Sequence, residues 1–191
     1  MNSLTPQEKA IIKSHAFAQI LSSSVSNSGF AELAYCPLQL LENNSFLGHL
    51  SATNPLIKEA KYNPKVKVIF SGPHGYISPR WHKEQIVPTW NYATISIVCH
   101  VNFIKNSMEK LDAIKKISHY FDPEWDFSNF NHDNNSKIVQ QMLSAITVFS
   151  LEIIEVKSKF KLSQNRSISC RTEFQKNLQL TGYNDLAKIQ L

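Results

Sequence analysis

Alternating apolar and polar residues fill much of the first half of the chain and predict short β-strands. The period-two pattern predicts strands in four segments, which are "FAQILSSS" from Phe17, "FAELAYCPLQLL" from Phe30, "FLGHL" at Phe46–Leu50 and "KVKVIFSG" at Lys65–Gly72. Between them, "NSGF" at Asn27–Phe30 and "ENNS" at Glu42–Ser45 have the Gly, Asn and Ser content that is typical of turns. These segments predict an antiparallel arrangement of strands joined by short turns.

The longest strand pattern is "VPTWNYATISIVCHVNF", from Val87 to Phe103. One of its two faces is polar at Thr89 and Asn91 and apolar from Ala93 onward. The strand is therefore expected to begin in a polar site and to end in the core.

Helical signals flank these strands. "TPQE" at Thr5–Glu8 is a capping box with Pro at the first helical position, and it predicts a helix over Pro6–His15. Further helices are predicted at "NPLIKEAK", at Ser107–Phe121 and at Lys137–Ala145, with a strand pair or one long bent strand in "TVFSLEIIEVKSKFKL". Strands and helices do not alternate regularly, so the pattern favours a mainly β protein, an antiparallel barrel with helices packed outside.

Length and composition narrow the classes of protein. The chain has 191 residues, 42% apolar and 18% charged, which predicts one globular domain over 1–191 with 167–191 as a helical C-terminal tail. The net charge of +5 favours anionic partners such as nucleic acid or phosphorylated cofactors.

No apolar run reaches membrane-spanning length, and three scattered cysteines without a CxxC pair suit a reducing cytoplasm. GxGxxG, P-loop, HExxH and GxSxG motifs are absent, which disfavours Rossmann dehydrogenases, P-loop NTPases, zincins and α/β-hydrolases.

The first candidate site is the proline-rich and aromatic stretch from Ser71 to Val98. "GPHGY" predicts a tight turn, and Pro79 and Pro88 restrict the residues before them to extended geometry. Rigidly framed aromatic residues beside Thr89 and Asn91 could form the wall of a pocket for a planar heteroaromatic ligand; these residues are Trp81, Trp90 and Tyr92. The alternative is that both tryptophans are core residues beside an ordinary loop.

Two further stretches carry polar chemistry. In "KFKLSQNR" at Lys159–Arg166, Lys161 and Arg166 could bind a phosphate, or the stretch could be a strand end that faces solvent. His49 precedes a predicted helix whose first turn could bind an anion, or it could be satisfied by a neighbour in its sheet.

Together, "GHLSATNP", "GPHGYISPRW", "VPTWNY" and "KFKLSQNR" resemble the PaiB-type family, which comprises bacterial FMN-binding proteins described as negative transcriptional regulators of sporulation and protease synthesis. The resemblance extends from about Phe17 to Arg166. It implies an FMN-binding split β-barrel, with FMN as cofactor and a homodimer that holds the flavin at the subunit interface. The cofactor-binding residues that it implies are His49, Ser78, Trp81, Thr89, Trp90, Asn91, Lys161, Ser163, Gln164 and Arg166.

Three functions remain open from the sequence. The first is a flavin-binding regulator of transcription, for which DNA is a partner although no helix-turn-helix recognition helix is evident. The second is a flavin-dependent oxidoreductase of small molecules, in which the cofactor carries the redox chemistry. The third is a haem or heterocycle binder that uses a histidine as axial ligand.

Overall fold

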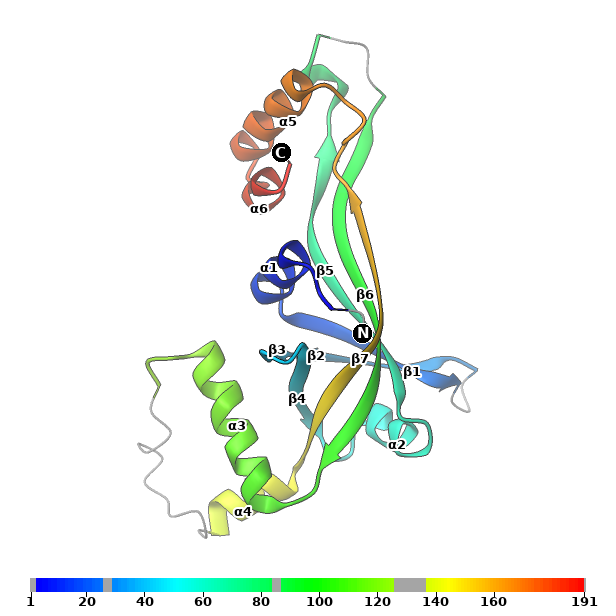
Figure 1. Ribbon diagram of the computed structural model, residues 1–191, viewed down its shortest axis with the longest axis vertical. Helices are drawn as coiled ribbons and strands as arrows, with labels where there is room; N and C mark the ends of the chain where they lie inside the picture. The colour runs from blue at the N-terminus through cyan, green and yellow to red at the C-terminus, as the bar shows by residue number, and fades with distance from the viewer. Residues whose placement is uncertain (1–2, 26–28, 84–86, 126–136, 191) are drawn as a thin grey trace. The chain divides into compact units, whose positions relative to one another are not determined.

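The computed structural model describes residues 3–25, 29–83, 87–125 and 137–190 (Figure 1). Its strands form a seven-stranded sheet in the order β2-β1-β5-β6-β7-β4-β3. The strands are β1 (Phe17–Val25), β2 (Ala31–Pro37), β3 (Gln39–Leu40), β4 (Ser45–Ser51), β5 (Lys65–Ile77), β6 (Thr89–Ile104) and β7 (Ile146–Lys161). The helices are α1 (Pro6–Ser14), α2 (Pro55–Tyr62), α3 (Ser107–Phe121), α4 (Lys137–Ser144), α5 (Ile168–Leu180) and α6 (Asn184–Lys188), with the 3-10 turn η1 (Pro79–Trp81).

The chain divides into two compact units. Unit 1 comprises residues 1–70 and 96–156, and unit 2 comprises residues 71–95 and 157–191. The long strands β5, β6 and β7 each contribute one part to unit 1 and the other part to unit 2.

Unit 1 contains the larger core. β4 pairs antiparallel with β7 from Ser45 opposite Glu152 to Ser51 opposite Ile146, and β1 pairs antiparallel with both β2 and β5. Large side chains from these strands are almost completely buried, among them Phe46, Phe70 and Phe149. Burial of apolar area on this scale is the main source of folding free energy.

Local signals fix the helices of unit 1. Thr5 and Glu8 form the capping box at the start of α1, as the sequence predicts. The Asn54 side chain accepts a hydrogen bond from the Leu56 amide at the start of α2, and Asn106 does the same at the start of α3. Among the described helices, none combines the length and the apolar character needed to cross a bilayer.

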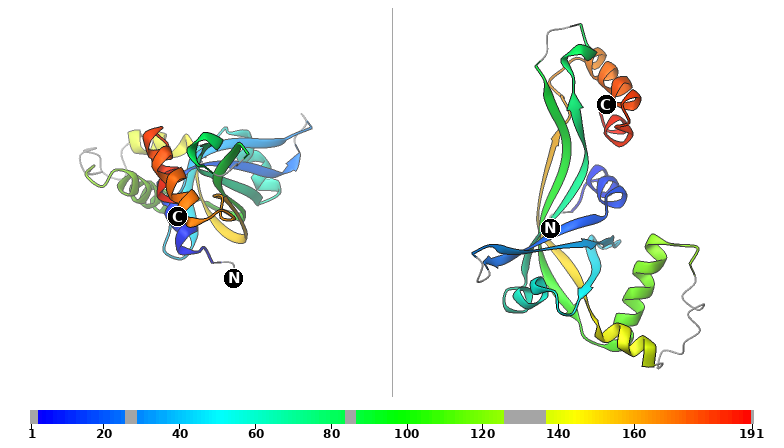
Figure 2. Two further views of the ribbon diagram at one scale, coloured as in Figure 1. Left: turned by 90° about the horizontal axis from the view of Figure 1, so that it is seen from above. Right: turned by 180° about the vertical axis from the view of Figure 1, so that it is seen from behind.

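Unit 2 is the end of a sheet with two helices packed on it. α5 and α6 lie beside the parts of β5, β6 and β7 that belong to this unit (Figures 1 and 2). Their apolar side chains form one cluster with residues of β5 and of the segment after β7; its buried members are Ile77, Leu162, Cys170, Phe174, Leu178, Leu186 and Ala187. Ser167 begins α5 by accepting a hydrogen bond from the Cys170 amide.

The structure confirms the mainly β, antiparallel prediction and corrects it at one place. The predicted tight turn at "GPHGY" is wrong, because β5 runs unbroken from Lys65 to Ile77. Gly75 instead allows close packing: a Cβ atom there would lie 2.9 Å from Cδ1 of Tyr183. The predicted turn at Asn27–Phe30 falls partly outside the described residues.

Candidate functional site

In unit 2, one face of the sheet is covered by helices. Ile77 of β5 is fully buried in the cluster under α5 and α6, and Phe160 of β7 packs against the same cluster. Asn91 of β6 is also fully buried and bonds to Gln190, which follows α6. These three residues therefore mark the covered face on β5, β6 and β7.

Strand alternation places a second set of residues on the opposite face. Because neighbouring residues of a strand point to opposite sides, His74, Tyr76, Trp90 and Lys161 lie on the face that α5 and α6 leave uncovered. All four are exposed, with 46% of Trp90 and 41% of Tyr76 accessible. We call these four residues the open face.

The open face is aromatic at its centre. The Trp90 ring centroid lies 5.8 Å from that of His74 and 6.4 Å from that of Tyr76. Both pairs are tilted, with interplanar angles of 31° and 50°. These two ring contacts restrict the indole while nearly half of it stays accessible, which suits stacking of a planar ligand.

Lys161 of β7 is bonded to the residue that precedes Trp90 on β6. Nζ of Lys161 donates a hydrogen bond to Oγ1 of Thr89 over 2.6 Å, and Thr89 directly precedes Trp90. The sequence-predicted cationic strand end and the predicted aromatic strand start are thus brought together. A candidate phosphate contact and a candidate ring contact therefore come from neighbouring positions of the two strands.

A buried polar network lies on the covered face. Oδ1 of Asn91 accepts from Oγ of Ser163 over 3.0 Å, and Nδ2 of Asn91 donates to Oε1 of Gln190 over 3.2 Å. Nε2 of Gln190 then donates to the Leu162 carbonyl over 2.6 Å. The network ties the start of β6 to the turn after β7, and thereby fixes the position of Lys161.

The turn after β7 is braced by its own side chains. Ser163 adopts a positive φ of 57°, and the Arg166 amide donates to the Ser163 carbonyl over 2.9 Å. Both amide atoms of Gln164 bond to the backbone, Oε1 to the Leu162 amide and Nε2 to the Phe160 carbonyl. Gln164 therefore holds the turn, and Arg166 is half-buried at its end.

Trp81 is separated from Trp90. Ser78 is buried and its Oγ accepts from the Arg80 amide, which starts the turn η1. This turn brings Trp81 against the apolar cluster of the covered face. Trp81 does not join Trp90 in the predicted aromatic wall: the core alternative describes Trp81, while Trp90 is on the open face and adjacent Asn91 points the other way.

His49 belongs to unit 1. It is half-buried on β4, and burial lowers the pKa of its imidazole. Its carbonyl accepts a hydrogen bond from Sγ of Cys36 over 3.2 Å. Gly48 beside it permits close packing, since a Cβ there would lie 2.6 Å from Cδ2 of Leu38.

Three residues of this arrangement are missing from the sequence prediction. His74 and Tyr76 lie in the segment that the sequence predicts as a turn. The burial pattern of β5 changes phase there, since Gly72 and Pro73 are both buried, so period-two spacing alone does not place these two residues on the exposed face. Gln190 is 99 residues from Asn91, and no local signal links the two.

Comparisons with known proteins identify the family of this chain. Residues 3–155 match the model of a family described as "Putative FMN-binding domain". The chain belongs to this FMN-binding domain family. The matched residues include β4, β5 and β6, and they end before Lys161.

One curated relative bears on the PaiB resemblance. The chain is 27% identical over 120 residues to "Protease synthase and sporulation protein PAI 2" of Bacillus subtilis, an alignment that covers 63% of this chain and 58% of the relative. This match confirms the resemblance to the PaiB-type family. The chain spans about three fifths of the length of the curated relatives it matches.

Solved structures define the fold. The FAD and heme binding protein from Mycobacterium smegmatis has a TM-score of 0.62 at 12% identity, covering 83% of this chain and 72% of that one. A protein from Bacteroides thetaiotaomicron titled "putative 5-nitroimidazole antibiotic resistance protein" also scores 0.62 at 14% identity, covering 82% and 84%. This FMN-binding domain thus has the split β-barrel fold, with flanking helices, that the resemblance implies.

Proposed function

We propose that this chain binds FMN on the open face of unit 2 and acts as a flavin-dependent regulatory protein of the PaiB type. The observation that carries the proposal is the Lys161–Thr89 contact of 2.6 Å, made by the residue that precedes the exposed Trp90. A cation that can bind a phosphate, Lys161, is thereby joined to the strand that carries a surface for ring stacking, Trp90. FMN, the family's cofactor, carries a planar ring and a phosphate, which match these two protein groups.

Each predicted residue except His49 has a role in this proposal. The flavin ring stacks on Trp90, and His74 and Tyr76 hold the indole in place. Lys161 and Arg166 bind the phosphate, while Thr89 orients the ammonium of Lys161. The supporting residues act from the covered face and the turn: they are Ser78, Trp81, Asn91, Ser163 and Gln164. His49 is in unit 1, and the proposal does not depend on it.

Bound flavin supplies redox chemistry, and the protein's residues bind it and set its surroundings. Stacking against an exposed indole leaves the flavin ring accessible from its other side. A partner surface or a small molecule could then reach the ring.

We infer that two copies associate through this exposed aromatic surface, with the flavin at the subunit interface. A group of exposed large side chains, Tyr76 and Trp90 among them, is typical of an interaction surface. The regulatory role rests on the likeness to PaiB-type proteins, and DNA is a partner that only this likeness favours. A reducing cytoplasmic location is supported by Cys36, Cys99 and Cys170, which are buried and not joined in disulfides.

The test is flavin retention by purified full-length protein. Lys161→Gln with Arg166→Gln should abolish the flavin absorbance and weaken FMN binding at least 100-fold, because two charged phosphate contacts are lost. The matched control is Arg80→Gln with Lys176→Gln, which removes the same two residue types from exposed positions of unit 2. Normal occupancy in the Lys161/Arg166 variant, with an unchanged circular dichroism spectrum, would refute the site.

The oxidoreductase alternative has its own readout. Bleaching of the bound flavin by NADH or NADPH at a catalytic rate would favour an enzyme. A flavin that neither nicotinamide reduces would favour the regulatory role.

A further inference from the structure

A groove in unit 1 is lined by three lysines that have no part in the proposed flavin site. It has a volume of about 490 Å³ and lies where the end of α2, the end of β6 and the start of α3 meet. Val101, Phe103 and Ile104 form its apolar part, and Lys61, Lys105 and Lys110 supply its charge. It shares no residue with the open face or with the other predicted flavin contacts.

The walls of this groove are fixed by backbone and cap contacts. The Val101 amide donates to the Pro64 carbonyl over 2.8 Å, which joins β6 to the segment after α2. Asn106 caps α3 by accepting from the amides of Met108 and Glu109 over 2.9 and 3.2 Å. A ligand would therefore meet a largely preformed surface, and little ordering would oppose binding.

The charged residues that line the groove are all positive. None of its lining residues is acidic, and within the described parts of the chain no ion pair is found for its three lysines. The adjoining cavity of about 420 Å³, which shares Ile104, is different: Glu109, Asp112 and Glu152 line it together with Lys116. The positive charge is thus a property of this groove and not of the whole surface around α3.

We propose that this groove binds a small phosphate monoester with a flat apolar body, as a second ligand besides the flavin. Three ammonium groups provide donors around a compact dianion, whereas a planar carboxylate is matched better by arginine. The apolar strand residues Val101, Phe103 and Ile104 provide the surface for the body of the ligand. The volume is in the range of small-molecule sites, roughly 300–1,000 Å³.

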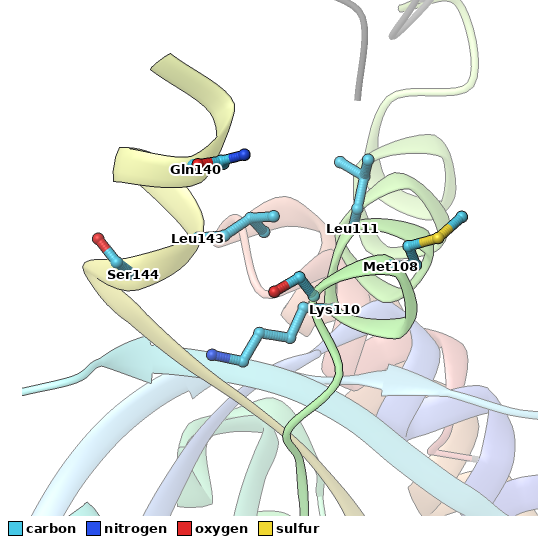
Figure 3. A pocket seen from close by; sticks show the side chains of 7 residues that line it. Met108, Lys110, Leu111, Gln140, Leu143 and Ser144 are labelled. Carbon is cyan, nitrogen blue, oxygen red and sulfur yellow. The ribbon is translucent and has the colours of Figure 1, made fainter. Parts of the chain in front are cut away.

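Lys110 is shared with another cavity, which affects the choice of variants. A pocket of about 510 Å³ between α3 and α4 is also lined by Lys110, together with Leu111 and Leu143 (Figure 3). The Lys110 side chain points away from Met108 in this view (Figure 3). Substitutions at Lys61 and Lys105 test the groove without altering the second pocket.

The experiment uses phenyl phosphate as probe and full-length protein saturated with FMN. Calorimetry should show binding at least tenfold tighter than for inorganic phosphate or phenol, because only phenyl phosphate contacts both the lysines and the apolar strand. With ¹³C-methyl labelling, the Ile104 resonance, assigned with Ile104→Val, should shift during the titration. Lys61→Gln with Lys105→Gln should weaken binding at least tenfold.

The matched control is Lys58→Gln with Lys116→Gln, which changes exposed lysines of α2 and α3 that do not line the groove and should leave the affinity unchanged. Unchanged affinity in the Lys61/Lys105 variant, or an unshifted Ile104 methyl, would overturn the proposal. Displacement of phenyl phosphate by FMN in the flavin-free protein would also overturn it, because the groove would then be part of the flavin site.

Discussion

The buried network around Gln190 provides a quantitative test of how unit 2 is held together. Gln190→Ala removes the acceptor of Asn91 Nδ2 and the donor to the Leu162 carbonyl, at distances of 3.2 and 2.6 Å. Each buried group left without a partner costs about 1–3 kcal/mol, so the two together cost about 2–6 kcal/mol. Water entering the space left by the side chain would recover part of this, and we expect a loss of about 3 kcal/mol in unfolding free energy.

Amide hydrogen exchange of α5 and α6 measures this loss locally. A change of about 3 kcal/mol should accelerate their exchange by about 100-fold, while helices of unit 1 such as α2 exchange as before. The control is Gln179→Ala, at an exposed position of α5. A double-mutant cycle with Asn91→Ala should give a coupling of about 1 kcal/mol. The reasoning fails if Gln190→Ala behaves like Gln179→Ala, or if the effects of Gln190→Ala and Asn91→Ala simply add.

Two further predictions concern packing and pH. Gly75→Ala places a Cβ 2.9 Å from Tyr183 and should destabilise unit 2 by about 1–3 kcal/mol in urea unfolding. Adding Tyr183→Ala to this variant should recover most of the lost unfolding free energy. No recovery would argue against the contact. Burial lowers the folded-state pKa of His49 below about 6.5, so its contribution to stability is complete above pH 6.5 and is lost as the pH falls below it. His49→Gln should therefore reduce the loss of unfolding free energy between pH 7 and pH 5, and an identical pH profile in both proteins would contradict this.

The sequence by itself determined the local structure. The capping residues Thr5 and Asn54 mark helix starts because the hydrogen bonds involved span only two or three residues. The period-two pattern of β6 predicted a face that is polar at Asn91 and buried in the core from Ala93 to Val101, as observed. In β5 the pattern is less informative, because its phase changes at Gly72 and Pro73, which are both buried, and the glycines of "GPHGY" favour a turn that the structure does not contain.

Only the tertiary structure decided which face of each strand is covered. Alternation assigns Trp90 and Asn91 to opposite faces, but it cannot tell which face α5 and α6 will cover. The partner of Asn91 is Gln190, 99 residues away, and the partner of Gly75 is Tyr183. Such contacts depend on where distant segments pack, and packing is determined by the free energy of the whole core and not by the residues near each strand.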